Sequence, residues 1–362
     1  MKQEVYDRFK NYKKDHCWQY EIRQQNLTKD LEEASLTQAD YTNLRIEDFE
    51  FSYVDKEDKK SCDEIKKFIQ THEWLGNLPN RPTHRFVARL RTNDALAGVV
   101  IMAIPNAFSH VVGKENKFKE RLISRGACIS WAPKNLGSWL IMSAIKHMVK
   151  HTEFRVFSAY SDPEAKELGT IYQACNFIYL GQGSGTAAQF YDNGYFGGKE
   201  KGWFTDREFR KKSMFMKYAK LIEPEFYKGI GFHDYQTKMF GFVSWEKAKH
   251  RPSCAKCKVL RWKSYERVIC ENPEHERQKR HTALRWKPNW KMMEGVYPGL
   301  KQRLKEEEEK YRLSCEKREM KPKHKYIYIL GRSKKETKKL KKLFDKLNPG
   351  VLELSYPSER GE

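Results

Sequence analysis

The stretch SAYSDPEAKELGTIYQACNFIYLG, from Ser158 to Gly181, contains two residues that can do acid–base chemistry. Asp162 follows an apolar run typical of a strand, and Pro163 stops that strand. Tyr172 belongs to the helical pattern AKELGTIYQACN that comes next. Functional groups in open α/β sheets gather where strands end and their connections diverge. We therefore predict that Asp162 accepts a proton and Tyr172 donates one, although a capping Asp and a core Tyr would give the same pattern.

A second group of residues that can do chemistry lies in PSCAKCKVLRWKSYERVICENPEHERQKRH. Cys254-x-x-Cys257 is followed after twelve residues by Cys270 and after four more by His275. Thiolates and an imidazole at such spacing are typical of a tetrahedral zinc site. We predict a structural zinc, because no paired acid accompanies the ligands. His281 could replace His275, and ordinary thiols in an Arg-rich loop are the alternative.

The net charge of the chain favours a polyanionic partner. Seventy Lys and Arg residues against 48 Asp and Glu give a formal charge of +22 over 362 residues. Such a surface attracts nucleic acid first and anionic membrane second. Solvated Lys-rich faces on an ordinary protein are the alternative.

The stretch GKEKGWFTDREFRKKSMFMKYAKLIEPEFYKG interleaves cations with aromatic residues. Cations can contact phosphates and aromatic rings can stack on bases, whereas core aromatics flanked by solvated Lys would give the same sequence. The aromatic residues are Trp203, Phe204, Phe209, Phe215 and Tyr218. The predicted phosphate contacts are Arg207, Arg210, Lys211 and Lys212.

The sequence gives no indication of export or of a membrane partner. No apolar run reaches the length of a membrane span, and no secretory signal opens the chain. Eight Cys scattered over the sequence are too sparse for a disulfide scaffold. We therefore expect the protein in a reducing cytoplasm.

The elements that must position the candidate residues form an α/β (α+β) pattern, with a mixed central sheet flanked by helices. We also predict a small zinc-ribbon-like insertion and a basic C-terminal segment. The predicted strands are 49–54, 84–90, 95–104, 125–132, 154–163 and 177–185, and the predicted helices are 61–76, 134–152 and 165–176. Ser61 is the expected cap of the first helix.

The same pattern predicts five segments. Residues 1–60 read as an N-terminal lead-in, and 61–190 as the catalytic core. They are followed by a basic, aromatic-rich extension at 191–250 and the zinc-binding insertion at 251–285. Residues 286–362 read as a charged helix followed by a strand and a Lys-rich helix.

Several motifs occur in the order found in one family. In IYQACNFIYLG, Tyr172 is followed by Asn176 and Phe177, and this unit resembles the last helix and strand of the GNAT acyltransferases. EWLG at 73–76, RGAC at 125–128, the Pro133-x-Asn135-x-x-Ser138 helix start and YSDP at 160–163 are more specifically similar to the Mom-type DNA modification proteins of bacteriophages. The likeness spans about residues 61–190 and, more loosely, the last forty.

This resemblance implies a GNAT-like fold and an enzyme acting on double-stranded DNA. Mom-type proteins convert the N6 amino group of adenine to a carbamoylmethyl derivative, which protects phage DNA from host restriction. The resemblance places Asp162 and Tyr172 at the active site. His72 and Glu73 stand where the family has a His-Tyr pair, and they are the further catalytic candidates.

The resemblance also implies the cofactors. Arg125, Asn135 and Ser138 correspond to positions that would hold the donor, which is acyl-CoA-like or another group donor. The pyrophosphate loop of ordinary GNAT enzymes is reduced here to WAPKNLGSWL, with Gly137 its one glycine. Iron, associated with Mom-type proteins, would have O and N ligands in Asp162, Tyr172 and His72. Two alternatives stay open: a GNAT-like N-acyltransferase acting on a protein, tRNA or small amine, and a non-catalytic nucleic-acid-binding module.

Overall fold

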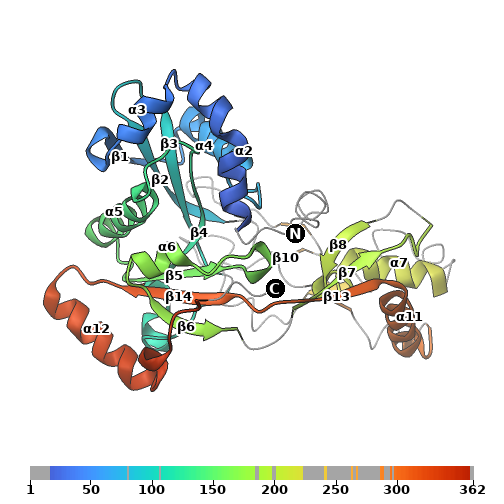
Figure 1. Ribbon diagram of the computed structural model, residues 1–362. Helices are drawn as coiled ribbons and strands as arrows, with labels where there is room; N and C mark the ends of the chain where they lie inside the picture. Colours follow the sequence, from blue (N-terminus) through green and yellow to red (C-terminus); the bar gives the residue numbers. More distant parts are fainter. Residues whose placement is uncertain are drawn as a thin grey trace. The chain divides into compact units, whose positions relative to one another are not determined.

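The computed structural model divides into two compact units, residues 1–187 with 319–362 and residues 188–318 (Figure 1). The described residues are 17–79, 81–105, 107–183, 187–197, 201–222 and 297–358, with short stretches at 240–242, 262–263, 266–267, 286–288 and 294–295. The first unit contains every catalytic and donor-binding residue predicted from the sequence. No helix in these stretches is long and apolar enough to cross a membrane.

The first unit is built on a mixed seven-stranded sheet in the order β1-β2-β3-β4-β5-β14-β6. The strands are β1 (Phe49–Val54), β2 (Pro82–Leu90), β3 (Leu96–Ala103), β4 (Glu120–Cys128), β5 (Val156–Ser161), β6 (Ile178–Gln182) and β14 (His324–Ile329). All neighbours are antiparallel except β4 and β5. The mixed α/β fold predicted from the sequence is confirmed, including the hairpin that β2 and β3 form.

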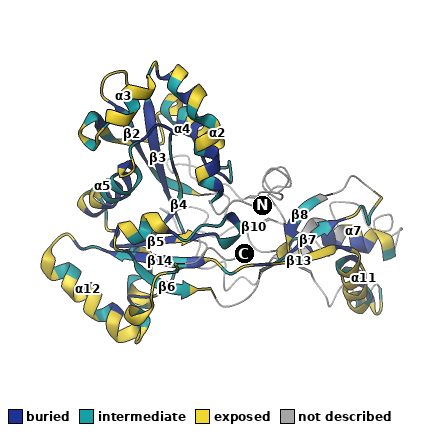
Figure 2. Cartoon of the chain, viewed as in Figure 1, coloured by how far each residue is buried: buried dark blue, intermediate teal, exposed yellow. Residues whose placement is uncertain are grey.

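Helices cover the sheet because their apolar stripes must be buried. They are α2 (Trp18–Glu33), α3 (Gln38–Asn43), α4 (Lys59–His72), α5 (Leu136–His151), α6 (Thr170–Ala174) and α12 (Lys334–Leu347). Short 3₁₀ turns are η1 (Ile46–Asp48), η2 (Lys114–Lys119), η3 (Pro163–Ala165) and η5 (Val351–Glu353). Every residue of β3 is buried, as the apolar run LAGVVIMA requires of a central strand, and Figure 2 shows this strand in the colour of buried residues.

Two local predictions were wrong in detail. Helix α4 begins two residues earlier than expected, because the Asp58 carboxylate, not Ser61, caps it by accepting the Ser61 N–H at 3.0 Å. The helix predicted at 165–176 is split into η3 and α6. Gly169, at φ +71°, makes the break possible: a Cβ there would lie 2.5 Å from the Tyr326 ring, so only glycine fits.

Both ends of the predicted 61–190 core were also wrong, because the first unit is larger. Residues from Trp18 onward are not a lead-in: α2 packs on α4, and β1 forms an edge strand of the central sheet. At the other end, β14 lies between β5 and β6, so the C-terminal strand belongs to the catalytic core. Pairing between segments so far apart leaves no local sequence signal.

Strands β4 and β5 separate soon after they meet. Their parallel pairing covers Glu120–Leu122 against Val156–Ser158 and does not continue along the rest of either strand. Backbone groups beyond these residues are therefore left to face other partners, and the space between the diverging strands is available for a ligand.

The second unit has its own aromatic core. A sheet in the order β13-β7-β8 (Glu316–Met320, Ala187–Asp192, Lys201–Thr205) accompanies η4 (Asp206–Glu208), α7 (Lys212–Ile222) and α11 (Leu300–Ser314). Shorter pairs are β9 (Phe240–Phe242) with β12 (Trp286–Pro288) and β10 (Trp262–Lys263) with β11 (Glu266–Arg267). Four of the five aromatic residues predicted as a stacking surface are buried in this core, which corrects that interpretation: Phe204, Phe209, Phe215 and Tyr218.

Candidate active site

Two cavities of the first unit meet at the same three ionisable side chains. One, of about 250 Å³, lies against β4 and the start of α5, and the other, of about 570 Å³, is lined in part by β4, Tyr160 and the segment after α4. Glu73, Glu167 and Tyr172 line both. The junction falls where β4 and β5 diverge, so groups entering from the two cavities would meet at these side chains.

Glu73 is placed by the end of helix α4, where it is the C-cap residue. Its carboxylate accepts the backbone N–H of Gly76 at 2.9 Å and lies 4.0 Å from the guanidinium of Arg125. Burial raises the pKa of Glu73 to about 7, with a further rise from the charge of Glu167 and an opposing effect of Arg125. At neutral pH this carboxylate exchanges a proton readily.

Glu167 is held by two donors from different elements. Its carboxylate accepts the indole N–H of Trp74 at 3.0 Å and the backbone N–H of Asp162 at 3.1 Å. Burial raises its pKa to about 7 although both hydrogen bonds act to lower it. Sequence reasoning missed Glu167 because its partner Trp74 lies far away in the chain. The acid five residues after Asp162 was the one available signal.

Tyr172 has its ring fixed and its hydroxyl free. The ring packs against Phe177 and Tyr326, with centroids 5.4 and 5.5 Å away. Among the described residues none is within hydrogen-bonding distance of the hydroxyl. Burial, followed by the charge of Glu167, raises the pKa of Tyr172, so the phenol stays protonated and can act as an acid.

Asp162 lies at the end of β5 as predicted, but its carboxylate is already engaged. It caps η3 by accepting the N–H of Glu164 at 3.1 Å, and it forms an ion pair with Lys323 at 2.6 Å. Asp162 also lines the larger cavity. The capping interpretation therefore describes its contacts, and Glu167 is the carboxylate beside Tyr172 that carries the raised pKa.

The three residues predicted to hold the donor are not brought together. Arg125 lines the larger cavity, where it donates to the backbone and side-chain oxygens of Asn77, each at 2.7 Å. Asn135 is the N-cap of α5, and the Ser138 hydroxyl donates to its carbonyl at 3.0 Å. Neither Asn135 nor Ser138 lines a cavity. Two of their neighbours, Lys134 and Gly137, line the smaller one.

His72 is buried away from both cavities. Its ring packs on Phe68, and Nδ1 lies 3.6 Å from the carboxylate of Asp30. Burial lowers its pKa. No three His, Cys, Asp or Glu side chains gather at one point in the described part of the chain, so the iron prediction finds no support there.

The predicted zinc ligands Cys254, Cys257, Cys270 and His275 lie outside the described residues, as does the alternative His281. The zinc site stays a prediction.

Two of the four predicted phosphate contacts are already paired. Arg210 forms an ion pair with Asp206 at 2.8 Å, and Lys211 pairs with Glu208. Arg207 is exposed, and the side chain of Lys212 is outside the described set. DNA contact by this segment stays a prediction.

The sheet and the paired carboxylates define an α/β protein with an acid–base site between two cavities. The chain belongs to the Mom protein family, whose model matches residues 48–254. That range contains Glu73, Glu167 and Tyr172, and it confirms the resemblance inferred from the motifs.

Among solved structures, similar chains include three acetyltransferases. A ribosomal-protein-S5-alanine acetyltransferase from Vibrio fischeri is 16% identical, covers 35% of this chain and 59% of its own, and has a TM-score of 0.24. A putative acetyltransferase from Salmonella typhimurium, with its cofactor acetyl-CoA, is 13% identical over 43% and 90%, with a TM-score of 0.27. The ribosomal-protein-S18-alanine N-acetyltransferase from Escherichia coli is 12% identical over 43% and 91%, with a TM-score of 0.25.

The raised pKa values of Glu73 and Glu167 predict how stability depends on pH. Folded-state pKa values near 7, above the model value of 4.5, mean that the folded state binds these protons more tightly than the unfolded state. Their contribution to stability is therefore fully present below about pH 4.5 and is lost as the pH rises through 7. We expect the free energy of unfolding contributed by this pair to fall between pH 5 and pH 8.

Denaturant titrations of the wild type and of Glu73→Gln across this pH range measure the effect. The variant should show a flatter pH dependence whatever its absolute stability, because one titrating group is gone. Equal slopes in the two proteins would mean that Glu73 titrates normally in the fold.

Proposed function

We propose that this chain is a GNAT-like transferase of Mom type, which modifies the N6 amino group of adenine in DNA to a carbamoylmethyl derivative. The observation that carries the proposal is the junction of two cavities at Glu73, Glu167 and Tyr172. Membership of the Mom protein family supports DNA as the substrate.

In this proposal the larger cavity receives the adenine base. Chemistry on N6 requires the base to leave the helical stack, and enzymes of this kind flip it into a pocket. Apolar side chains such as Leu75, Pro79 and Leu122 line the cavity, while Arg81 and Lys323 supply cations. An apolar slot with cations suits a base carrying a phosphodiester.

The smaller cavity suits an acyl-CoA-like donor. Its lining reaches the first turn of α5, where helix N–H groups and the Lys134 ammonium would hold the pyrophosphate. Such a donor supplies an electrophilic carbon attached to a leaving sulfur. Gly137 permits the close approach of α5 to α6, since a Cβ there would lie 2.8 Å from the side chain of Ile171.

The side chains at the junction supply the proton transfers. Adenine N6 is a poor nucleophile, because its lone pair is delocalised into the ring. As the N–C bond forms, Glu167 or Glu73 accepts the N6 proton, for which a pKa near 7 is well matched. As the bond from carbon to sulfur breaks, Tyr172 donates its proton to the leaving thiolate. Protons and electron pairs balance, with one thiol released.

The test is to express the chain together with a plasmid, digest the plasmid to nucleosides and analyse them by mass spectrometry. We expect a deoxyadenosine that carries the added mass of a carbamoylmethyl group, absent when the chain is not expressed. Unmodified plasmid together with acetylated protein or tRNA would instead identify an N-acyltransferase with another acceptor.

A further inference from the structure

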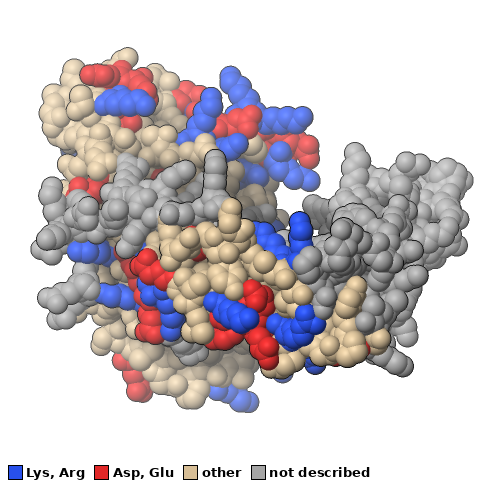
Figure 3. Space-filling view, turned by 90° about the vertical axis from the view of Figure 1, so that its right-hand side faces the viewer, with Lys and Arg blue, Asp and Glu red and all other residues tan. Residues whose placement is uncertain are grey.

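Helix α12 has an unusual distribution of charge. Seven of its fourteen residues are exposed lysines: Lys334, Lys335, Lys338, Lys339, Lys341, Lys342 and Lys346. Among the described residues no carboxylate forms an ion pair with any of them. On the face drawn in Figure 3, by contrast, Lys and Arg side chains lie beside Asp and Glu. The lysines of α12 therefore produce a positive field that nearby acids do not cancel.

Four of these lysines share one side of the helix and line a groove. Lys334, Lys338, Lys341 and Lys342 are spaced at i, i+4, i+7 and i+8, which places them on one face. With Arg332, Ser333, Thr337 and Asp345 they line a surface groove of about 620 Å³. Lys335, Lys339 and Lys346 do not line it. Four ammonium groups on one groove, against the single carboxylate of Asp345 among its lining residues, complement a chain of phosphates.

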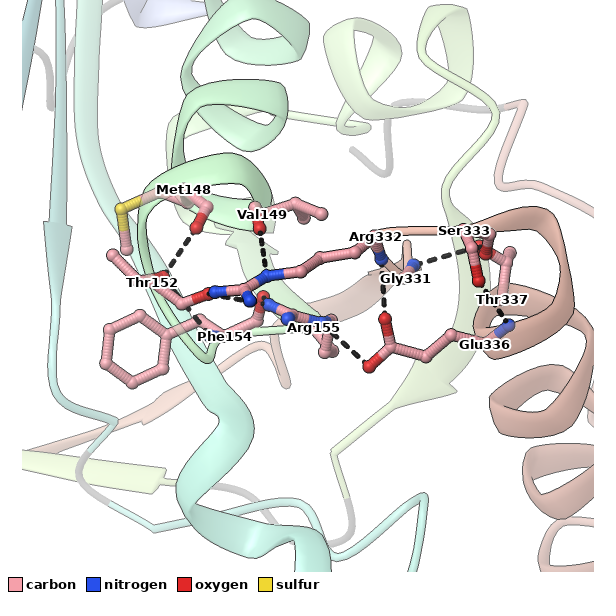
Figure 4. A network of polar contacts seen from close by, with 10 residues as sticks. All are labelled: Met148, Val149, Thr152, Phe154, Arg155, Gly331, Arg332, Ser333, Glu336 and Thr337. Carbon is pink, nitrogen blue, oxygen red and sulfur yellow. Dashed lines mark hydrogen bonds and ion pairs between the residues drawn. The ribbon is translucent and has the colours of Figure 1, made fainter.

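The start of the helix is held rigidly by a network that uses its acidic residue (Figure 4). Glu336 accepts from the guanidinium of Arg155 at 2.9 Å and from the backbone N–H of Arg332 at 2.6 Å. The Arg332 side chain in turn donates to the carbonyls of Val149 and Thr152 at the end of α5. Glu336 therefore neutralises Arg155 and not the lysines.

The apolar face of α12 is already used inside the protein. Leu340 and Phe344 are buried against the sheet and η5. A helix that binds a lipid surface inserts such residues into the membrane. Since these two are not available for insertion, the charged face is left for a soluble polyanion.

We propose that the groove lined by Lys334, Lys338, Lys341 and Lys342 is a docking surface for the phosphate backbone of double-stranded DNA. The choice of DNA rests on the proposed function, whereas the groove and its charge are properties of the fold. The surface lies outside residues 48–254 that match the family. It reads no sequence; it adds affinity and orients the duplex.

The test compares two triple variants with the same loss of charge from the same helix. In Lys334→Gln/Lys338→Gln/Lys341→Gln the groove loses three cations, and in Lys335→Gln/Lys339→Gln/Lys346→Gln the neighbouring face loses three. Binding of the full chain to a short unmodified duplex is measured over a range of salt concentrations, without donor. Thermal unfolding of all three proteins checks that α12 stays folded.

We expect the groove variant to bind at least about tenfold more weakly and to lose up to about 2.7 from the slope of log K against log salt, at about 0.9 for each phosphate contact. The control variant should keep nearly the wild-type slope. Equal changes in both variants would overturn the proposal in favour of a diffuse positive field. Loss of binding to phosphatidylserine vesicles with unchanged DNA binding would overturn it in favour of a membrane surface.

The outcome is separate from that of the proposed function. If the plasmid carries no modified adenine but the groove variant alone loses its salt slope, the docking surface stands and the adenine chemistry fails. If modified adenine is found but the two variants bind alike, the chemistry stands and the docking surface fails.

Discussion

Glu167→Gln should lower the rate of adenine modification by about 10² to 10⁴, the range typical of a lost general base. The amide has nearly the shape of the carboxylate and cannot take up the N6 proton. In the wild type the rate should rise with pH around a midpoint near 7, because the base must be ionised. The measurement is the yield of modified deoxyadenosine from purified protein, donor and duplex DNA between pH 5.5 and 8.5.

Glu164→Gln is the matched control. Glu164 lies three residues earlier, accepts the backbone N–H of Lys321 at 2.8 Å and is not among the lining residues of either cavity. It should keep its activity. If Glu167→Gln retains the wild-type rate while Glu73→Gln abolishes it, Glu73 is the base. If both retain it, the base lies elsewhere, and Asp162 is the next carboxylate of the larger cavity.

Tyr172→Phe should reduce modification by about 10² to 10⁴ while leaving the fold intact. The ring contacts with Phe177 and Tyr326 are kept, and the lost hydroxyl has no partner among the described residues, so little packing energy is lost. The deficit should appear in kcat, because the proton is needed by the leaving group. Single-turnover measurement of modification, beside thermal unfolding, separates chemistry from stability.

Tyr179→Phe provides the comparison. The Tyr179 hydroxyl bonds to Nδ1 of His324 at 2.7 Å, and the side chain does not line either cavity. Its removal should leave kcat unchanged. A Tyr172→Phe variant with near-normal turnover would show that the hydroxyl is not the acid and that Tyr172 is a core residue of α6.

Local patterns in the sequence predicted most strands of the first unit. The apolar run of β3 and the turn before it are sufficient for a hairpin, and the helical spacing of Ile65, Phe68 and Ile69 is sufficient for α4. The split between η3 and α6 was missed, because it depends on the packing of Tyr326 against Gly169. That contact joins segments more than a hundred residues apart, and no local pattern encodes it.

The site was predicted in part for the same reason. Tyr172 and Glu73 were found from motifs, and both line the cavity junction. Glu167 was missed because its environment is formed by Trp74 from another element. Asp162 was chosen for its place at a strand end, which fits a cap and a catalytic acid equally well. Only the ion pair with Lys323 separates the two roles, and it too joins distant parts of the chain.

The place of β14 in the sheet has a consequence for synthesis on the ribosome. Strands β5 and β6 do not pair with each other, since β14 hydrogen-bonds to both. Until the residues of β14 leave the exit tunnel, β5 and β6 each have an open edge, and all of residues 188–318 is made in the meantime. A nascent chain of this protein would therefore spend much of its synthesis with an incomplete sheet, in which the last strand to emerge joins its two halves.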